Sequence, residues 1–377
     1  MIKKIASLLL CSTMVFTSVF AEDSVVSDTE SVQQPEHKVY TLTLDEAINT
    51  ALDGNPQFIV WESEKDNLKK QLSAAKITKS NYKSTRLVSA SSGLELKYVR
   101  GGYYVHSCEK AIELKDLERK QIEAKISYDV TQKYYNLKNC EKLVEIAKSS
   151  YNLVTENYNN AKLSYSLGLI SRNDLDNTEL SVKRAKYTYE QYANNLEIAK
   201  EDFKISLRKN SEDCEMILPQ EIVCEDYEPD TAKDIAAAEA SRYDISGLKT
   251  SYDLAKEYFD LTGLTPDSAT YTDAYAKYVS AEYNYTNNKD LILLGVKSSA
   301  NGVRSAKNDA DAAQTNLSLK QDAYRIAKVK FDQGMITSSE LASSLIETSQ
   351  AEIENENAKL NYKLAVEKYK YEISIGL

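Results

Sequence analysis

Apolar side chains recur along this chain at alternating steps of three and four residues. One series comprises Leu137, Cys140, Val144, Ala147, Tyr151, Val154, Tyr158, Ala161 and Tyr165. A second series comprises Leu175, Thr178, Val182, Ala185, Tyr189, Tyr192, Leu196, Ala199 and Phe203. This heptad spacing is typical of helices that pack side by side, with knobs entering holes. The pattern therefore predicts an antiparallel coiled-coil hairpin that reverses between the two series.

The same hairpin is predicted a second time, 166 residues further along the chain. The segment YSLGLISRNDL at 165–175 corresponds to FDQGMITSSEL at 331–341, and the register holds without gaps from 130–199 to 296–365. A single long helix cannot enclose a core of its own, so these helices must pack against others. The predicted fold class is mainly all-α, a duplicated pair of long antiparallel hairpins.

Glycine marks both predicted reversals, at Gly168 and Gly334. A residue at a helix end often takes positive φ, which glycine adopts without a Cβ clash. The returning helices open with apparent capping boxes, Ser171 with Asp174 and Thr337 with Glu340. Aspartate is the weaker partner at this position, since Glu and Gln are the usual third residues of the box.

Apolar residues stand at both reversals, namely Leu169, Ile170, Met335 and Ile336. Apolar side chains at an exposed hairpin end are costly unless a partner covers them, so they indicate a binding surface. An ordinary helix-turn-helix corner is the alternative, which explains one such turn but not its repetition.

The positions of the prolines and the net charge of the chain restrict both the fold and the class of partner. No proline falls between residues 57 and 218 or after 267, which leaves room for very long helices. The formal net charge of -10, with no cluster of Lys and Arg, argues against a nucleic-acid partner.

The first 21 residues have the pattern of a secretory signal peptide. Lys3 and Lys4 precede an apolar run, and Val19, Phe20 and Ala21 suit signal peptidase. A lipidated Cys11 is the alternative, but Leu10 is large for the position before it. We therefore expect an exported protein of the cell envelope. No later apolar run approaches the ~20 residues of a membrane-spanning helix.

The cysteines and histidines offer little chemistry. Cys214 and Cys224 flank Pro219 in an irregular segment, and in an exported protein they could form a disulfide. Cys140 is expected to be a buried thiol. Neither metal-ligand spacing nor a motif of nucleophile, base and orienting group occurs, so we expect no metal, no cofactor and no enzymatic activity.

The expected organisation has a short non-helical segment at each repeat boundary. We divide the chain into a signal peptide at 1–21, a flexible segment at 22–40, repeat 1 at 41–210, an acidic linker at 211–230 and repeat 2 at 231–377. A short insertion is expected within repeat 1, at 78–107. Eight acidic residues and no Lys or Arg lie between Ser211 and Asp230.

Several of these segments resemble the outer-membrane efflux proteins, the TolC-like channels of tripartite exporters and type I secretion. LTLDEAINTALDGNPQF at 42–58 is similar to the first-helix signature of that family. DIAAAEASRYDI at 234–245 is similar to the start of its second half, although Tyr243 replaces the usual proline. YSLGLISRNDLDNTEL and FDQGMITSSELASSLI resemble its hairpin tips.

The resemblance implies a homotrimer whose hairpins form a hollow helical cylinder. It implies a passive export duct that works with a periplasmic adaptor, or membrane fusion protein, of an inner-membrane pump. The adaptor contacts would be the hairpin-tip residues Leu167, Gly168, Leu169, Ile170, Gly334, Met335 and Ile336. Asp174 and Glu340 would line the entrance, although capping is an equal explanation for both.

The membrane-anchoring strands of that family are hard to find here. Only Leu94, Leu96 and Tyr98 alternate convincingly, so we expect at most a short β element at 85–106 and a reduced or missing barrel. Residues 262–289 have helical spacing instead. The outer membrane, or the cell surface where there is none, is the implied location. A structural coiled-coil protein of the envelope is the alternative function.

Overall fold

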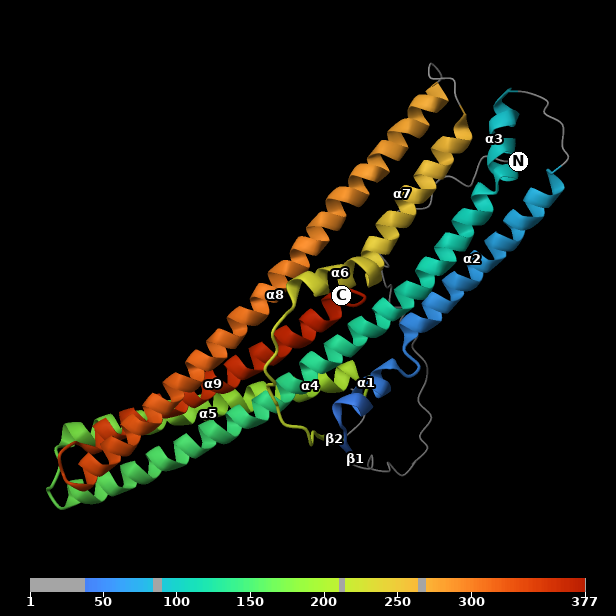
Figure 1. Cartoon of the computed structure of the whole chain (residues 1–377). Helices are drawn as coiled ribbons and strands as arrows, with labels where there is room; N and C mark the ends of the chain where they lie inside the picture. The colour runs from blue at the N-terminus through green and yellow to red at the C-terminus, as the bar shows by residue number, and fades with distance from the viewer. Residues whose placement is uncertain (1–37, 84–89, 210–213, 264–268, 377) are drawn as a thin grey trace, which may run out of the picture. The chain divides into compact units, whose positions relative to one another are not determined.

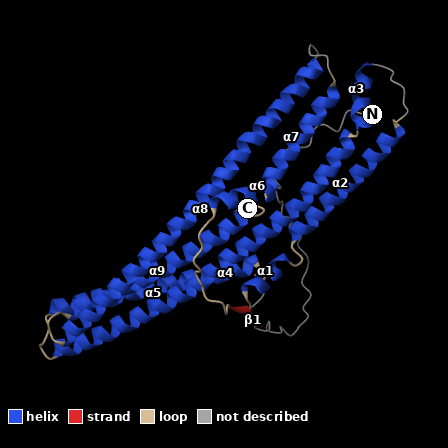
Figure 2. Cartoon of the chain, viewed as in Figure 1, coloured by secondary structure: helices blue, strands red, loops and turns tan. Residues whose placement is uncertain are grey.

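Helices make up nearly all of the part of the chain that the structure describes (Figure 2). The computed structural model describes residues 38–83, 90–209, 214–263 and 269–376. The expected signal peptide and residues 22–37 fall outside these ranges. In chain order the elements are β1 Lys38–Thr41, α1 Leu44–Leu52, α2 Pro56–Asn81, α3 Ala90–Gly101, α4 Tyr103–Ser166, α5 Arg172–Ser206, β2 Cys214–Ile217, α6 Thr231–Ser241, α7 Tyr243–Thr262, α8 Ala269–Asp332 and α9 Ser338–Glu372.

The expected duplication is present in the helix bounds themselves. Helices α4 and α8 have 64 residues each, and α5 and α9 have 35 each. Both pairs are separated by the same 166 residues. The equivalence therefore reaches back to the first residues of α4 and α8, further than the apolar pattern alone showed.

The long helices pack along one another in a fixed sequence. Helix α4 runs beside α5, and α8 runs beside α9, as expected for two hairpins. Helix α4 also packs along α9, which joins the repeats (Figure 1). Helix α2 packs on α4, and α7 packs on both α8 and α4.

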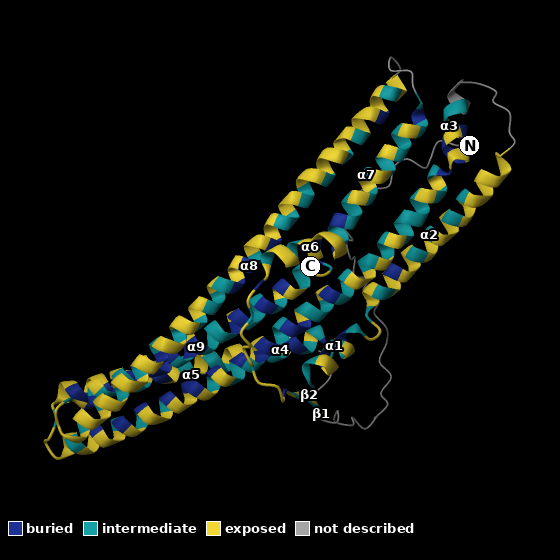
Figure 3. Cartoon of the chain, viewed as in Figure 1, coloured by how far each residue is buried: buried dark blue, intermediate teal, exposed yellow. Residues whose placement is uncertain are grey.

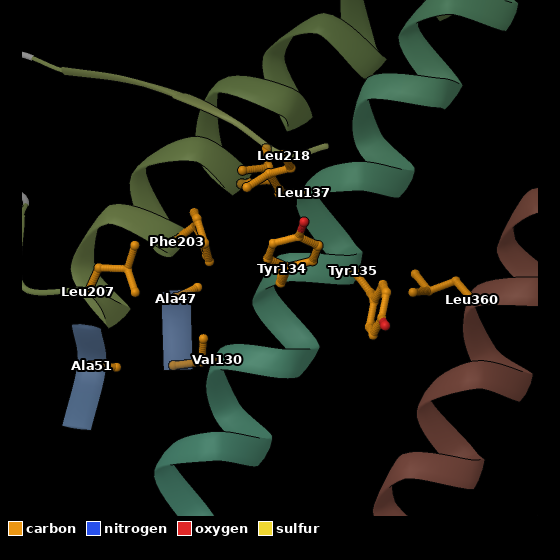
Figure 4. Close-up of a cluster of buried hydrophobic side chains, with 11 residues drawn as sticks. Ala47, Ala51, Val130, Tyr134, Tyr135, Leu137, Phe203, Leu207, Leu218 and Leu360 are labelled. Atoms are coloured by element: carbon orange, nitrogen blue, oxygen red, sulfur yellow. The ribbon is translucent and has the colours of Figure 1, made fainter. Parts of the chain in front are cut away.

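Each repeat has a hydrophobic core built from equivalent residues, and the first core also includes Leu360 of α9. In the first core, Val130, Leu137 and Phe203 pack against Ala47 of α1 (Figure 4). The second core has Val296, Val303 and Tyr369 at the equivalent positions, packed against Ala238 of α6. Complete burial of one such side chain contributes roughly 1.5–3 kcal/mol. In Figure 3 the buried residues, coloured dark blue, lie along the sides where the helices pack against one another.

The described residues of the insertion are helical, which agrees with the expectation of at most a short β element there. Residues 90–101 form the helix α3, and residues 84–89 lie outside the described ranges. Leu96 and Val99 are buried at helical spacing, and Tyr98 hydrogen-bonds Thr262 at 2.8 Å and stacks on Tyr258 of α7. The packing of α3 on α7 therefore stabilises a helix here.

A short parallel strand pair forms where the sequence suggested irregular structure. Strand β1 pairs with β2, with Lys38 opposite Cys214 and Thr41 opposite Ile217. The last residues of the expected flexible segment at 22–40 therefore belong to a strand. Residues 214–217 of the expected linker form the other strand. Paired backbone groups satisfy their hydrogen bonds in this way without any apolar pattern in the sequence.

The expected disulfide is absent from the structure, in which Cys214 and Cys224 are both free thiols. Cys214 is buried in β2, whereas the Sγ of Cys224 donates to the carbonyl of Lys359 in α9, 3.3 Å away. The strand pairing and the contact with α9 direct the two thiols to different neighbours. Cys140, expected to be buried, is only half-buried and packs against the edge of the first core.

Candidate functional site

Each hairpin reverses through the same hydrogen-bonded turn. At the end of α4, the amide of Leu169 donates to the carbonyl of Ser164 and that of Gly168 to Tyr165, both at 2.9 Å. At the end of α8, Met335 donates to Lys330 and Gly334 to Phe331, both at 2.8 Å. These are Schellman turns, and the glycines have φ of +72° and +69°. The glycine requirement at both tips is thereby explained.

The helices that return from the two tips are capped differently. Thr337 and Glu340 form a complete capping box, in which the Glu340 carboxylate accepts from the Thr337 amide at 2.8 Å. Ser171 accepts from the Asp174 amide at 3.1 Å, but the Asp174 carboxylate does not complete the box. Asp174 is instead buried, and its Oδ2 has no hydrogen-bond partner. Glu340 therefore completes a capping box. At the other tip only one of the two hydrogen bonds of the box forms, the one that Ser171 accepts from the Asp174 amide.

The apolar tip residues divide into exposed and half-buried ones. Leu169 is 72% exposed, Met335 68% and Leu167 65%. Ile170 and Ile336 are half-buried. We call Leu167, Leu169 and Met335 the tip patch, since these three present apolar surface that no part of the described chain covers.

The two tips lie side by side at one end of the long helices (Figure 1). The Asn157 Nδ2 of α4 donates to the carbonyl of Ser338, at the start of α9, across 2.8 Å. Val154, Ala185, Ala342 and Leu345 pack together just behind this bond. The tip patch is thus one surface built from both repeats.

Beside the first turn, Arg172 gives this end of α5 a fixed charge. Its guanidinium pairs with Asp176 at 2.9 Å and lies 5.9 Å from the ring centre of Tyr165. The hydrogen bond that Arg172 donates to the Asp176 carboxylate raises the pKa of Arg172. The apolar tip patch therefore has a charged border at the first hairpin.

A second candidate surface, which the sequence did not reveal, runs along α5 and α8. On α9, Ile353 is 2% exposed because it packs against Leu143 and Ile146 of α4. Its equivalent on α5 is Tyr187, which is 69% exposed. The equivalents of Leu143 and Ile146 on α8 are Asp309 and Ala312. Helix α5 therefore exposes the face that is equivalent to the buried face of α9. Helix α8 has the face that is equivalent to the one with which α4 covers α9.

The same relationship holds nearer to the start of the long helices. Tyr128 of α4 packs edge-on against Tyr371 of α9, with ring centres 5.7 Å apart, and burial raises the pKa of both hydroxyls. Their equivalents are Leu294 of α8 and Ile205 of α5. Both are exposed, at 60% and 55%.

A third contact repeats the pattern among the shorter helices. Helix α4 packs on α7 around a hydrogen bond of 2.6 Å between His106 Nδ1 and Glu257 Oε2. One repeat later, α8 borders an open groove of about 490 Å³ that Ala276 and Ser280 line. Helix α2 carries the exposed side chains Ile59 and Val60.

The described residues show no site for a metal. No group of three or more His, Cys, Asp or Glu side chains comes together within the described ranges in a way that could hold an ion. None of the helices in those ranges combines the length and the hydropathy that crossing a membrane requires.

Solved structures with the same fold are outer-membrane proteins of bacteria. The outer membrane protein VceC of Vibrio cholerae matches with a TM-score of 0.70 and 10% identity, over 88% of this chain and 96% of that one. The MtrE outer membrane channel of Neisseria gonorrhoeae, in its open state, matches at 0.66 and 16%, over 88% and 89%. The CmeC outer membrane channel of Campylobacter jejuni matches at 0.63 and 12%, over 88% and 85%.

Sequence comparison adds nothing to this likeness. No protein-family description and no curated protein matches the chain. At 10–16% identity the likeness to solved structures establishes the fold, and it confirms the expected TolC-like helical architecture.

Proposed function

We propose that this protein is the subunit of a passive export duct in the cell envelope. In this proposal the copies join through α8 of one and α5 of the next, and three copies close a ring. The tip patch then faces a periplasmic adaptor of an efflux or secretion pump. The outer membrane is the proposed location, by analogy with the proteins of like fold.

One observation carries the proposal, namely the exposure of Tyr187 where Ile353 is buried. Inside the chain, α4 packs against α9. The equivalent faces, one on α8 and one on α5, do not pack against each other within the described chain. Contacts of this head-to-tail kind generate a closed ring when the rotation between copies suits it. A ring whose walls are helices encloses a passage, so the same contact supports the role of a duct.

Cysteine cross-linking tests the ring directly. Because Tyr128 and Tyr371 touch within the chain, Leu294 of one copy and Ile205 of the next should touch in the ring. The double variant Leu294→Cys with Ile205→Cys should give dimers and trimers on a non-reducing gel, and nothing larger. Each single variant is the matched control and should remain a monomer on the same gel.

Other outcomes would decide against the proposal. A ladder that continues beyond three copies indicates an open filament, and a double variant that never cross-links removes the ring. A closed trimer that binds no adaptor from its own organism favours the alternative, a structural coiled-coil protein of the envelope. Pull-down with a tagged adaptor distinguishes these two functions.

A further inference from the structure

The two hairpins differ at one level of their inner seams. Between α4 and α5, the rings of Tyr151 and Tyr189 lie parallel, with centres 6.2 Å apart, and fill the seam. The equivalent positions between α8 and α9 are Leu317 and Asn355. Two aromatic rings are thus replaced by one branched side chain and one small amide.

A cleft lies where the second hairpin lacks these rings. It has a volume of about 420 Å³, is bordered by α4, α8 and α9, and is lined by both Leu317 and Asn355. Asn355 is 1% exposed, yet its Oδ1 has no hydrogen-bond partner. A buried acceptor without a donor is destabilising, because it has lost its hydrogen bonds to water. A donor that entered the cleft beside Asn355 would offset this cost.

A smaller hollow of about 210 Å³ continues the cleft toward the hairpin tips. Ile146, Leu153, Tyr324 and Leu345 give it apolar walls. Glu352 lines both the cleft and the hollow, so it stands where the two meet. Polar side chains such as Ser150 and Thr348 complete the lining of the hollow beside these apolar ones.

The charges around the cleft leave one carboxylate unmatched. Lys142 pairs with Glu145 at 2.8 Å, and Lys359 pairs with Glu356 at 3.0 Å. Glu352 forms no ion pair within the described ranges. Repeat 1 has Lys186 at the position equivalent to Glu352, and that lysine pairs with Glu190 at 3.4 Å. The negative charge is therefore particular to the second hairpin.

We propose that this cleft binds a small organic cation, a primary ammonium with an apolar tail. The ammonium donates hydrogen bonds to the Asn355 Oδ1 and to the Glu352 carboxylate, and the tail lies in the hollow between Ile146 and Leu345. Charge-assisted hydrogen bonds are about twice as strong as neutral ones, so the head group selects the ligand. The proposal concerns the chain itself and does not depend on its being a duct.

Calorimetric titration of the full mature protein with n-hexylamine tests the site. At neutral pH hexylamine carries its charge, as a lysine does. Hexan-1-ol and hexanoate keep the tail but change the head group. We expect hexylamine to bind with roughly tenfold higher affinity than either, a difference that one charged hydrogen bond can supply.

Three variants locate the binding. Glu352→Gln keeps the shape and should weaken hexylamine roughly tenfold, to the level of hexanol. Asn355→Tyr restores the residue of the first hairpin and should abolish binding by filling the cleft. Lys186→Gln removes a charge at the same level of the other hairpin, and hexylamine should bind it as it binds the wild type.

The proposal is overturned if wild-type protein does not bind hexylamine, or if it binds hexanol equally well. Unchanged affinity in Glu352→Gln would place any binding elsewhere and overturn it too. Should Asn355→Tyr fail to fold, the Glu352→Gln variant and the head-group series still decide, because Glu352 is only half-buried.

Discussion

Tyr187 and Ile353 occupy the same position of the two repeats, and one is 69% exposed whereas the other is 2% exposed. The difference arises from neighbours and not from the helices, since α5 and α9 have the same length and the same register. Helix α9 has α4 beside it, and α5 has no such neighbour on that side within the described chain. Substitutions at these two positions should therefore distinguish an effect on the joining of copies from an effect on the folding of the subunit.

This pair gives the first prediction. Tyr187→Asp should leave the helix content and the folding of the subunit unchanged but prevent the copies from joining, because it places a charge in the contact between them. Ile353→Asp should destabilise the subunit itself by about 3 kcal/mol or more, because it buries an unpaired charge against α4. Light scattering and thermal melting of both variants provide the measurement. Equal loss of folding in both would contradict the assignment of Tyr187 to a contact between copies.

Much of this fold could be predicted because the apolar residues repeat at helical spacing. Leu137, Val154 and Ala199 were placed on helix seams by spacing alone, and all three are buried. The outer faces could not be predicted, because neither Tyr187 nor Ile353 belongs to the three-and-four series of its helix, yet one is exposed and the other is buried. Only comparison of equivalent positions in the folded chain distinguishes a helix face that the chain buries from the equivalent face that it leaves exposed.

The conformation of the insertion could not be predicted for a different reason. Leu94, Leu96 and Tyr98 alternate as in a strand, and short apolar runs of this kind do not distinguish strands from helices. Tyr98 becomes helical because it stacks on Tyr258, at a distance in sequence that no local pattern shows. The same applies to the bond from Asn157 to Ser338, which places the two tips together.

The glycines of the two repeats allow a test of the turn geometry. Gly334→Ala should destabilise the subunit by about 1 kcal/mol, because its φ of +69° is unfavourable for a residue with a Cβ. Gly302→Ala, inside α8 with open space around the position of a Cβ, should stabilise it by about 0.5–1 kcal/mol. Chemical denaturation of both variants measures the two effects. If Gly334→Ala is as stable as the wild type or more stable, the left-handed turn at Gly334 is wrong.

The two linker cysteines give a chemical test of the free thiols. In native protein under oxidising conditions, iodoacetamide should label Cys224, which is exposed, and should label Cys214 only after unfolding, because it is buried. Tryptic mass spectrometry of the alkylated protein identifies each site. A disulfide between Cys214 and Cys224 would instead protect both residues until a reductant is added, and would restore the pairing expected from the sequence.

The tip patch separates the functional role of the hairpin ends from a structural one. Replacing Leu169 and Met335 together with Asp should abolish adaptor binding, because the charges would be buried without partners in the contact. The melting temperature should hardly change, since both side chains are exposed and surface substitutions usually shift stability by no more than ~0.5 kcal/mol.

Val154→Asp is the matched control for that variant. Val154 is fully buried behind the tips with Ala185 and Ala342, so a carboxylate there should cost about 3 kcal/mol or more and lower the helix content. Adaptor pull-down and thermal melting are measured on both variants. If the tip variant melts like the wild type and still captures the adaptor, these turns serve only to reverse the chain, and adaptor docking must be sought along the sides of the hairpins.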